Sequence, residues 1–194
     1  MPGVLVALAQ LNSQPNVADN LAVVSRLVAE AAGRGASMVV LPENFAIMGA
    51  SEAEKVVAAE VLVGDARGVI IDTLRELASA HRVAIIGGGM PEVSDDIARP
   101  YNSCVCVDAA GQMVAVYRKI HLFDVDLADG TAFTESAYTS AGRDIVVCEL
   151  AGVKLGLGRS TSIGVEARQP LQPTVRGVDD APISTVRFTL STSF

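Results

Sequence analysis

The chain has 194 residues, of which 50% are hydrophobic and 19% charged, a composition that supports one globular domain with a sizeable core. Its 22 acidic residues outnumber the 15 basic ones, for a net charge of -7, and no basic cluster offers a footprint for nucleic acid. The longest apolar runs, such as residues 4–9 and 83–86, fall far short of the roughly 20 residues that span a bilayer. The N-terminal residues lack a signal-peptide pattern, so a cytoplasmic location is expected.

In chain order, the first 90 residues alternate short apolar runs with segments of helical period, the pattern of βαβ units in an α/β fold. Asn16 and Asp65 are the expected N-caps of two helices, and Gly87-Gly88-Gly89 is expected to end a strand. The predicted strands are 4–9, 37–41 and 83–87, and the predicted helices are 17–31, 52–61 and 66–80.

Antiparallel hairpins follow in the second half of the chain. Residues 101–107 and 113–117 flank a turn at 108–111, and residues 145–150 and 153–157 meet at Ala151-Gly152. After Gly158 the sequence is rich in Ser, Thr, Arg, Gly and Pro, without helical periodicity. We therefore divide the chain into a domain at 1–158 and a divergent tail at 159–194 that is expected to be poorly ordered.

The three cysteines, Cys104, Cys106 and Cys148, lack the spacing of metal ligands. Cys104 and Cys106 are two residues apart on a predicted strand, so their side chains share one face. We interpret all three as buried free thiols.

Two segments carry residues suited to chemistry. Residues 41–45, Leu-Pro-Glu-Asn-Phe, place Glu43 just beyond a buried strand, where open α/β sheets bind ligands, so Glu43 is a candidate general base. Residues 117–124, Tyr-Arg-Lys-Ile-His-Leu-Phe-Asp, place Lys119 where a fixed ammonium could stabilise an oxyanion. Each residue alone also fits a simpler role: Glu43 as a capping or surface acid, Lys119 as a solvated strand end, and His121 as a structural histidine.

Together and in this order, the two segments resemble the nitrilase superfamily of carbon-nitrogen hydrolases. The resemblance covers about residues 4–158 and is strongest to the Nit, omega-amidase-like branch. Further matching positions are Gln10 and residues 86–92, 101–103, 119–126 and 133–136.

The resemblance implies a nitrilase-like αββα sandwich, paired sheet to sheet with a twin subunit, and a Glu-Lys-Cys mechanism without metal or organic cofactor. The implied substrates are small linear non-peptide amides, such as omega-amides of keto acids or deaminated glutathione. Carried over by motif, Glu43 is the general base and Lys119 the oxyanion stabiliser. Glu135 matches the second glutamate of the family, which positions Lys119 and substrate; alone, it also fits an exposed loop acid.

The resemblance ends where the nucleophile is due. The family has its cysteine shortly after a Gly-Leu-Gly strand end, whereas here residues 156–158 lead into Arg159-Ser160. Ser160 stands at the expected position, and a serine hydroxyl is a much poorer nucleophile than a thiolate. We therefore expect an inactive chain whose sandwich is incomplete in its C-terminal half, through truncation or an altered reading frame. The alternatives are a non-catalytic relative that binds a small acid or a partner subunit, and an α/β domain of another kind.

Overall fold

The computed structural model describes residues 4–49, 51–64, 66–157, 162–166 and 186–189. The described helices are α1 (Val17–Gly33), α2 (Glu52–Val57), α3 (Val69–His81) and the short 3-10 helix η1 (Glu135–Ala137). The described strands are β1 (Val6–Leu8), β2 (Met38–Val40), β3 (Ala84–Glu92), β4 (Tyr101–Val107), β5 (Met113–Arg118), β6 (Asp124–Asp126), β7 (Ala132–Thr134), β8 (Val146–Leu150), β9 (Val153–Leu157), β10 (Ser162–Glu166) and β11 (Val186–Thr189).

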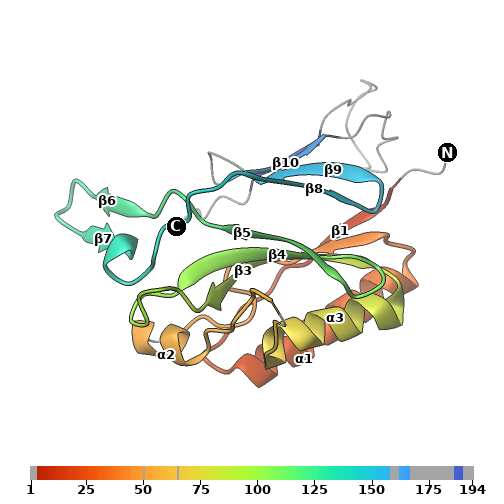
Figure 1. The fold of residues 1–194 in the computed structure, drawn as a ribbon, viewed down its shortest axis with the longest axis horizontal. Coiled ribbons are helices and arrows are strands. Elements are labelled where there is room, and N and C mark those ends of the chain that lie inside the picture. Colours follow the sequence, from red (N-terminus) through yellow and green to blue (C-terminus); the bar gives the residue numbers. More distant parts are fainter. Residues whose placement is uncertain (1–3, 50, 65, 158–161, 167–185, 190–194) are drawn as a thin grey trace.

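Two sheets lie face to face, and α1 and α3 cover the outer face of one of them (Figure 1). The five-stranded sheet has the order β1-β2-β3-β4-β5; its first three strands are parallel, and β4 and β5 are antiparallel to their neighbours. The second sheet has the order β11-β10-β9-β8 and is antiparallel throughout. The predicted α/β class and both predicted hairpins are confirmed.

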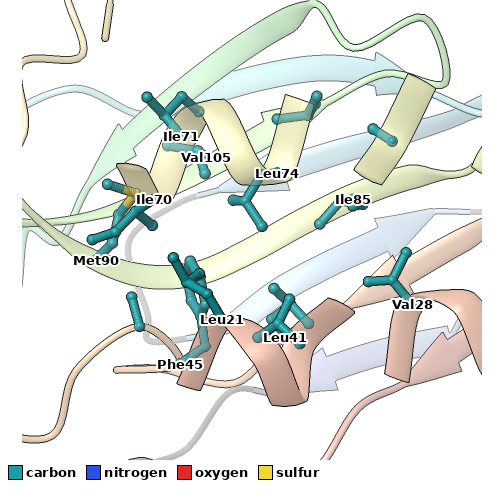
Figure 2. Close-up of a cluster of buried hydrophobic side chains, with 14 of the residues drawn as sticks. Leu21, Val28, Leu41, Phe45, Ile70, Ile71, Leu74, Ile85, Met90 and Val105 are labelled. Carbon is teal, nitrogen blue, oxygen red and sulfur yellow. The ribbon is translucent and has the colours of Figure 1, made fainter. Parts of the chain in front are cut away.

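Apolar side chains fill the gap on each side of the five-stranded sheet. Alternate residues of a strand point to opposite faces, so β4 directs Val105 and Val107 toward the helices and Cys104 and Cys106 toward the second sheet. Figure 2 shows the helix side, where Leu21 and other side chains of α1 and α3 meet those of the sheet. Each large side chain buried here stabilises the fold by about 1.5–3 kcal/mol.

The helix caps agree with the sequence for α1 and differ for α3. The Asn16 side chain accepts a hydrogen bond from the Asp19 backbone N–H at 3.2 Å, as predicted. The α3 helix begins after Gly68 rather than after Asp65, which lies outside the described residues. Its first N–H groups donate instead to Glu60, at 2.7 Å from Ile70 and 3.0 Å from Ile71. A capping rule that considers only the residue before a helix cannot find so distant an acceptor.

The expectation that Gly87-Gly88-Gly89 ends the third strand is wrong. Strand β3 continues through the glycines to Glu92, with a register shift between Gly87 and Met90. A Cβ atom at Gly88 would collide with the carbonyl oxygen of Leu41, and one at Gly89 would lie 2.6 Å from Oδ1 of Asn102. The glycines are therefore needed for the close approach of neighbouring segments within a continuing strand.

Further differences concern strand β1, the segment after β5 and the tail. Strand β1 is shorter than predicted and lies at a sheet edge, where Leu8 is 63% exposed. The small β6–β7 hairpin has no counterpart in the sequence analysis. Strands β10 and β11 fall within the tail 159–194, but most of the tail, including Ser160, lies outside the described residues. The expectation of a poorly ordered tail therefore stays a prediction.

Candidate active site

Glu43 stands on a segment that is tied to the glycines of β3. The segment leaves β2 through Pro42, and the backbone N–H groups of Leu41 and Asn44 donate to Ile86 and Gly89 at 2.8 and 3.0 Å. Asn44 adopts a left-handed conformation with φ 57°, which turns the chain directly after Glu43. Glu43 is thus held beside the glycines in the middle of strand β3.

Lys119 directly follows β5, and hydrogen bonds hold its backbone on two sides. Its N–H donates to the carbonyl of Asn102 at 2.8 Å, and its carbonyl accepts from the N–H of Gly142 at 2.8 Å. A Cβ atom at Gly142 would collide with the backbone of Arg118, so this close contact requires glycine. The position of Lys119 is therefore set by tertiary contacts as well as by its strand.

The three predicted site residues meet at the ammonium of Lys119. Nζ lies 2.9 Å from Oε2 and 3.2 Å from Oε1 of Glu135, and 3.2 Å from Oε1 of Glu43. The side chains of Lys119, Glu43 and Glu135 are only 12%, 17% and 20% exposed. Glu43 and Lys119 are 76 residues apart in the chain, so only the fold brings them together.

Opposing effects act on the charge of Lys119. Burial alone would lower the pKa of its ammonium, but the hydrogen bond to Glu135 and the negative charge of Glu43 outweigh this effect. The net result is a pKa above the ordinary value of 10.5, so Lys119 is a cation at neutral pH. A buried cation held by two carboxylates can stabilise negative charge that develops nearby.

Asn102 joins the site, although sequence reasoning did not select it as a site residue. Its Nδ2 donates to Oε1 of Glu43 at 2.6 Å, and its carbonyl oxygen accepts from Lys119. It therefore connects the carboxylate and the backbone of the ammonium-bearing residue. The sequence offers one indication of this role, because Asn102 lies in the segment 101–103 that matches the family. That match does not indicate which side chain of the segment contacts Glu43.

The cluster lines a cavity of about 370 Å³, within the range of small-molecule sites. Apolar side chains form much of the wall, with Met48 on one segment and Phe123 and Phe133 around the β6–β7 hairpin. The ion pair of Glu52 and Lys55, 3.0 Å apart, also lines it. The cavity thus combines an apolar surface with charged groups, which suits a small polar organic ligand.

The structure does not bring the cysteines to this cavity. Cys104 and Cys106 are buried in the cluster between the sheets, and Cys148 is partly buried against it. A hydrogen bond with Cys104 and burial raise the pKa of the Cys106 thiol, although a hydrogen bond with Cys148 acts the other way. The pKa of Cys148 is also raised, by its hydrogen bond with Cys106 and by burial. Both thiols therefore stay protonated and are poor nucleophiles.

Within the part of the chain that the structure describes, neither cysteine nor serine lines the cavity. His121 is exposed and does not line it. Among the same described residues, no group of three or more His, Cys, Asp or Glu side chains is arranged to hold a metal ion. None of the described helices is both long and apolar enough to cross a membrane.

Comparison with known proteins identifies the fold first. The chain superposes on the NitFhit protein of C. elegans with a TM-score of 0.64 and 27% identity, over 73% of this chain and 34% of that one. The stacked sheets with their covering helices are a nitrilase fold, as the sequence predicted. The carbon-nitrogen hydrolase family profile matches residues 5–186, and the chain belongs to this family. The match extends beyond residue 158, where the resemblance was expected to end.

Two curated relatives support the predicted branch. Deaminated glutathione amidase of Synechocystis sp. (strain PCC 6803 / GT-S) is 36% identical over 140 residues, which cover 72% of this chain and 50% of the relative. Omega-amidase NIT2 of Danio rerio is 35% identical over 153 residues, which cover 79% and 53%. The resemblance to the Nit, omega-amidase-like branch is confirmed. The chain spans about half the length of these curated relatives.

Proposed function

We propose that this chain represents an amidase lineage that hydrolyses small linear amides, with Glu43, Lys119 and Glu135 at the catalytic centre. The observation that carries the proposal is the Lys119 ammonium within 3.2 Å of both carboxylates, in a cavity of about 370 Å³. The names of the two relatives, which describe amidases, support an amide as the substrate.

The proposed roles follow from the positions of the three groups. A nucleophile adds to the amide carbonyl while Glu43 takes its proton, and the resulting oxyanion is stabilised by the charge of Lys119. The C–N bond then breaks, and Glu43 returns the proton to the leaving amine. Water attacks the acyl intermediate in the same way, which releases the acid and regenerates the nucleophile. Glu135 keeps Lys119 in place through its two short contacts.

The nucleophile is the part of this mechanism that the described residues do not supply. The family resemblance implies a cysteine, but Cys104, Cys106 and Cys148 lie between or against the sheets, and Ser160 lies outside the described residues. We therefore propose that this chain has no appreciable amidase activity, even though the remaining groups are assembled.

The test combines turnover with binding. The purified chain is incubated with succinamate and butyramide, ammonia release is measured, and binding of each amide is followed by saturation-transfer NMR. We expect binding that Glu43→Gln weakens, and ammonia release no faster than in a control without protein. Rapid release that is abolished by Ser160→Ala would show that Ser160 acts as the nucleophile. Absence of binding would contradict the proposed substrate site.

A non-catalytic role in ligand or partner binding is the second candidate. It is favoured by the lack of a described cysteine or serine in the lining of an otherwise assembled cavity. Binding of the free acid succinate as tight as that of succinamate would support it. Pairing with a second subunit, which the family resemblance implies, is tested by light scattering of the purified protein.

A further inference from the structure

A second polar cluster lies beside the candidate active site and belongs to none of its proposed steps. It comprises Glu92 at the end of β3, Ser103 in β4 and Arg118 at the end of β5, which we call the Glu92 clamp. Oε2 of Glu92 accepts from Oγ of Ser103 at 2.6 Å and from Nε of Arg118 at 2.8 Å, while Oε1 accepts from Nη2 of Arg118 at 2.6 Å. One carboxylate therefore ties three neighbouring strands together.

The clamp is strongly constrained by burial and charge. The side chain of Glu92 is 1% exposed, so its negative charge depends on these partners rather than on water. The contact with Arg118 is bidentate, which restricts the orientation of both groups as well as their distance. The guanidinium also stacks on the ring of Tyr101, 4.3 Å from its centroid. Arg118 is thus held from two directions.

The clamp faces a cavity other than the candidate active site. Glu92 and Arg118 line a space of about 610 Å³ and are absent from the lining of the cavity that holds Lys119. Tyr101 lines both cavities and forms part of the wall between them. Glu92 and Arg118 therefore do not touch a substrate bound beside Lys119.

The strand register nevertheless places the clamp next to the active-site residues. Ser103 pairs with Arg118, and the next hydrogen bond along these strands joins Lys119 to Asn102. Consecutive residues of a strand point to opposite faces, so Arg118 and Lys119 diverge. The clamp thus joins the two strand ends that carry Asn102 and Lys119.

We propose that Glu92 and Arg118 are positioning residues that hold the β3, β4 and β5 ends so that Lys119 stays in contact with Glu43 and Glu135. Nζ of Lys119 lies 2.9 Å from Oε2 of Glu135 and 3.2 Å from Oε1 of Glu43. A displacement of the strand ends by about 1 Å would break these hydrogen bonds. The catalytic consequence rests on the proposed function. The positioning itself does not, because it is measurable without turnover.

The experiment follows the titration of the Lys119 side chain by NMR in protein labelled at the lysine Cε atoms. Arg118→Met removes the guanidinium and keeps a side chain of similar length. We expect a downward shift of the Lys119 pKa, since contact with the two carboxylates raises it and burial lowers it. Lys154, which is exposed, serves as the internal reference and should not shift.

The matched control is Arg34→Met. Arg34 forms an ion pair with Glu30 at 2.6 Å beside α1 and lines neither cavity, so its loss removes a guanidinium far from the three strand ends. Its loss should leave the Lys119 titration unchanged. Ser103→Ala, which keeps the ion pair, should give a smaller shift than Arg118→Met.

Arg118→Met leaves the buried charge of Glu92 without its main partner and could unfold the protein. The double variant Glu92→Leu, Arg118→Leu removes both charges and is used in that case. A folded variant in which Lys119 titrates as in the unmodified protein would overturn the proposal. A shift in a chain that binds neither succinamate nor butyramide would support the positioning role and separately contradict the proposed substrate site.

Discussion

Oε2 of Glu135 lies 2.9 Å from Nζ of Lys119 and 2.6 Å from the backbone nitrogen of Phe123. One carboxylate oxygen therefore joins the ammonium to the segment that precedes β6. The Glu135 N–H donates in turn to the Phe123 carbonyl at 3.2 Å, so the two residues are paired in both directions. Glu135 thus couples the β6–β7 hairpin, which forms one wall of the cavity, to the charge at its centre.

This relationship predicts the effect of Glu135→Gln. The glutamine can still accept the Phe123 hydrogen bond but lacks the negative charge, so the pKa of Lys119 should fall. Lysine Cε titration by NMR measures the change. Glu149→Gln, at an exposed position of β8, is the control and should have no effect. An unchanged Lys119 titration in Glu135→Gln would mean that Glu43 alone maintains the raised pKa.

The same cluster predicts how stability changes at alkaline pH. The pKa of Lys119 is raised in the folded state, so its contribution to stability is fully present below the ordinary value of 10.5 and is lost as pH rises through the folded pKa. Urea unfolding across this range should show a steeper loss of stability in the unmodified protein than in Lys119→Met. The difference between these curves removes the shared effect of tyrosine and cysteine ionisation. Lys154→Met, the control, should follow the unmodified protein.

Asn102→Ala tests the link between Glu43 and the strand that supports it. The variant loses the 2.6 Å hydrogen bond to the Glu43 carboxylate, a charge-assisted contact in a partly buried site. We expect a loss of about 1–3 kcal/mol in the free energy of unfolding, measured with urea. Asn12→Ala, at an exposed position, should change it by less than about 0.5 kcal/mol. Equal effects of the two substitutions would contradict the proposed importance of this contact.

Gly88→Ala tests the close approach of β3 to the segment that carries Glu43. The added Cβ would collide with the Leu41 carbonyl oxygen, a backbone atom that cannot rotate away. We expect destabilisation of about 1–3 kcal/mol, typical of overpacking, together with weaker amide binding. Gly33→Ala is the matched control, because nothing lies within 4 Å of its Cβ position at the end of α1. It should leave stability unchanged or raise it by up to about 1 kcal/mol.

Thiol reactivity tests whether any described cysteine is an activated nucleophile. Cys104 and Cys106 are buried, and the pKa values of the Cys106 and Cys148 thiols are raised. Native protein at neutral pH should therefore react slowly with a thiol-specific disulfide reagent, while protein in guanidinium should react at all three cysteines. Fast modification of one cysteine that is blocked by succinamate would contradict the interpretation of these residues as buried free thiols.

Several elements could be predicted because their signals are local. Asn16 precedes a segment of helical period and can cap it with its own side chain, and the α1 cap has this form. The turn at residues 108–111 and the alternation of β4 likewise depend on neighbouring residues. Glu43 and Lys119 were found by motif, since each lies at the end of a strand whose residues are recognisable in the sequence.

Other features depend on residues distant in the chain, and these were missed. Glu60 caps α3 across a loop, and the glycines of β3 remain in a strand because Leu41 and Asn102 pass close to them. The bond from Asn102 to Glu43 and the clamp of Glu92 with Arg118 join separate strands. A pattern of neighbouring residue types contains no information about these distances.

The sequence alone thus determined the α/β class, most of the helices and strands, and the family to which the chain belongs, because periodicity, turn residues and motifs are properties of contiguous segments. The tertiary structure decided that Glu43, Lys119 and Glu135 share one cavity and that Cys104 and Cys106 are excluded from it. The physical reason is the pairing of strands into a sheet, which brings residues up to 76 positions apart to hydrogen-bonding distance. Within each strand, adjacent side chains point to opposite faces of the sheet.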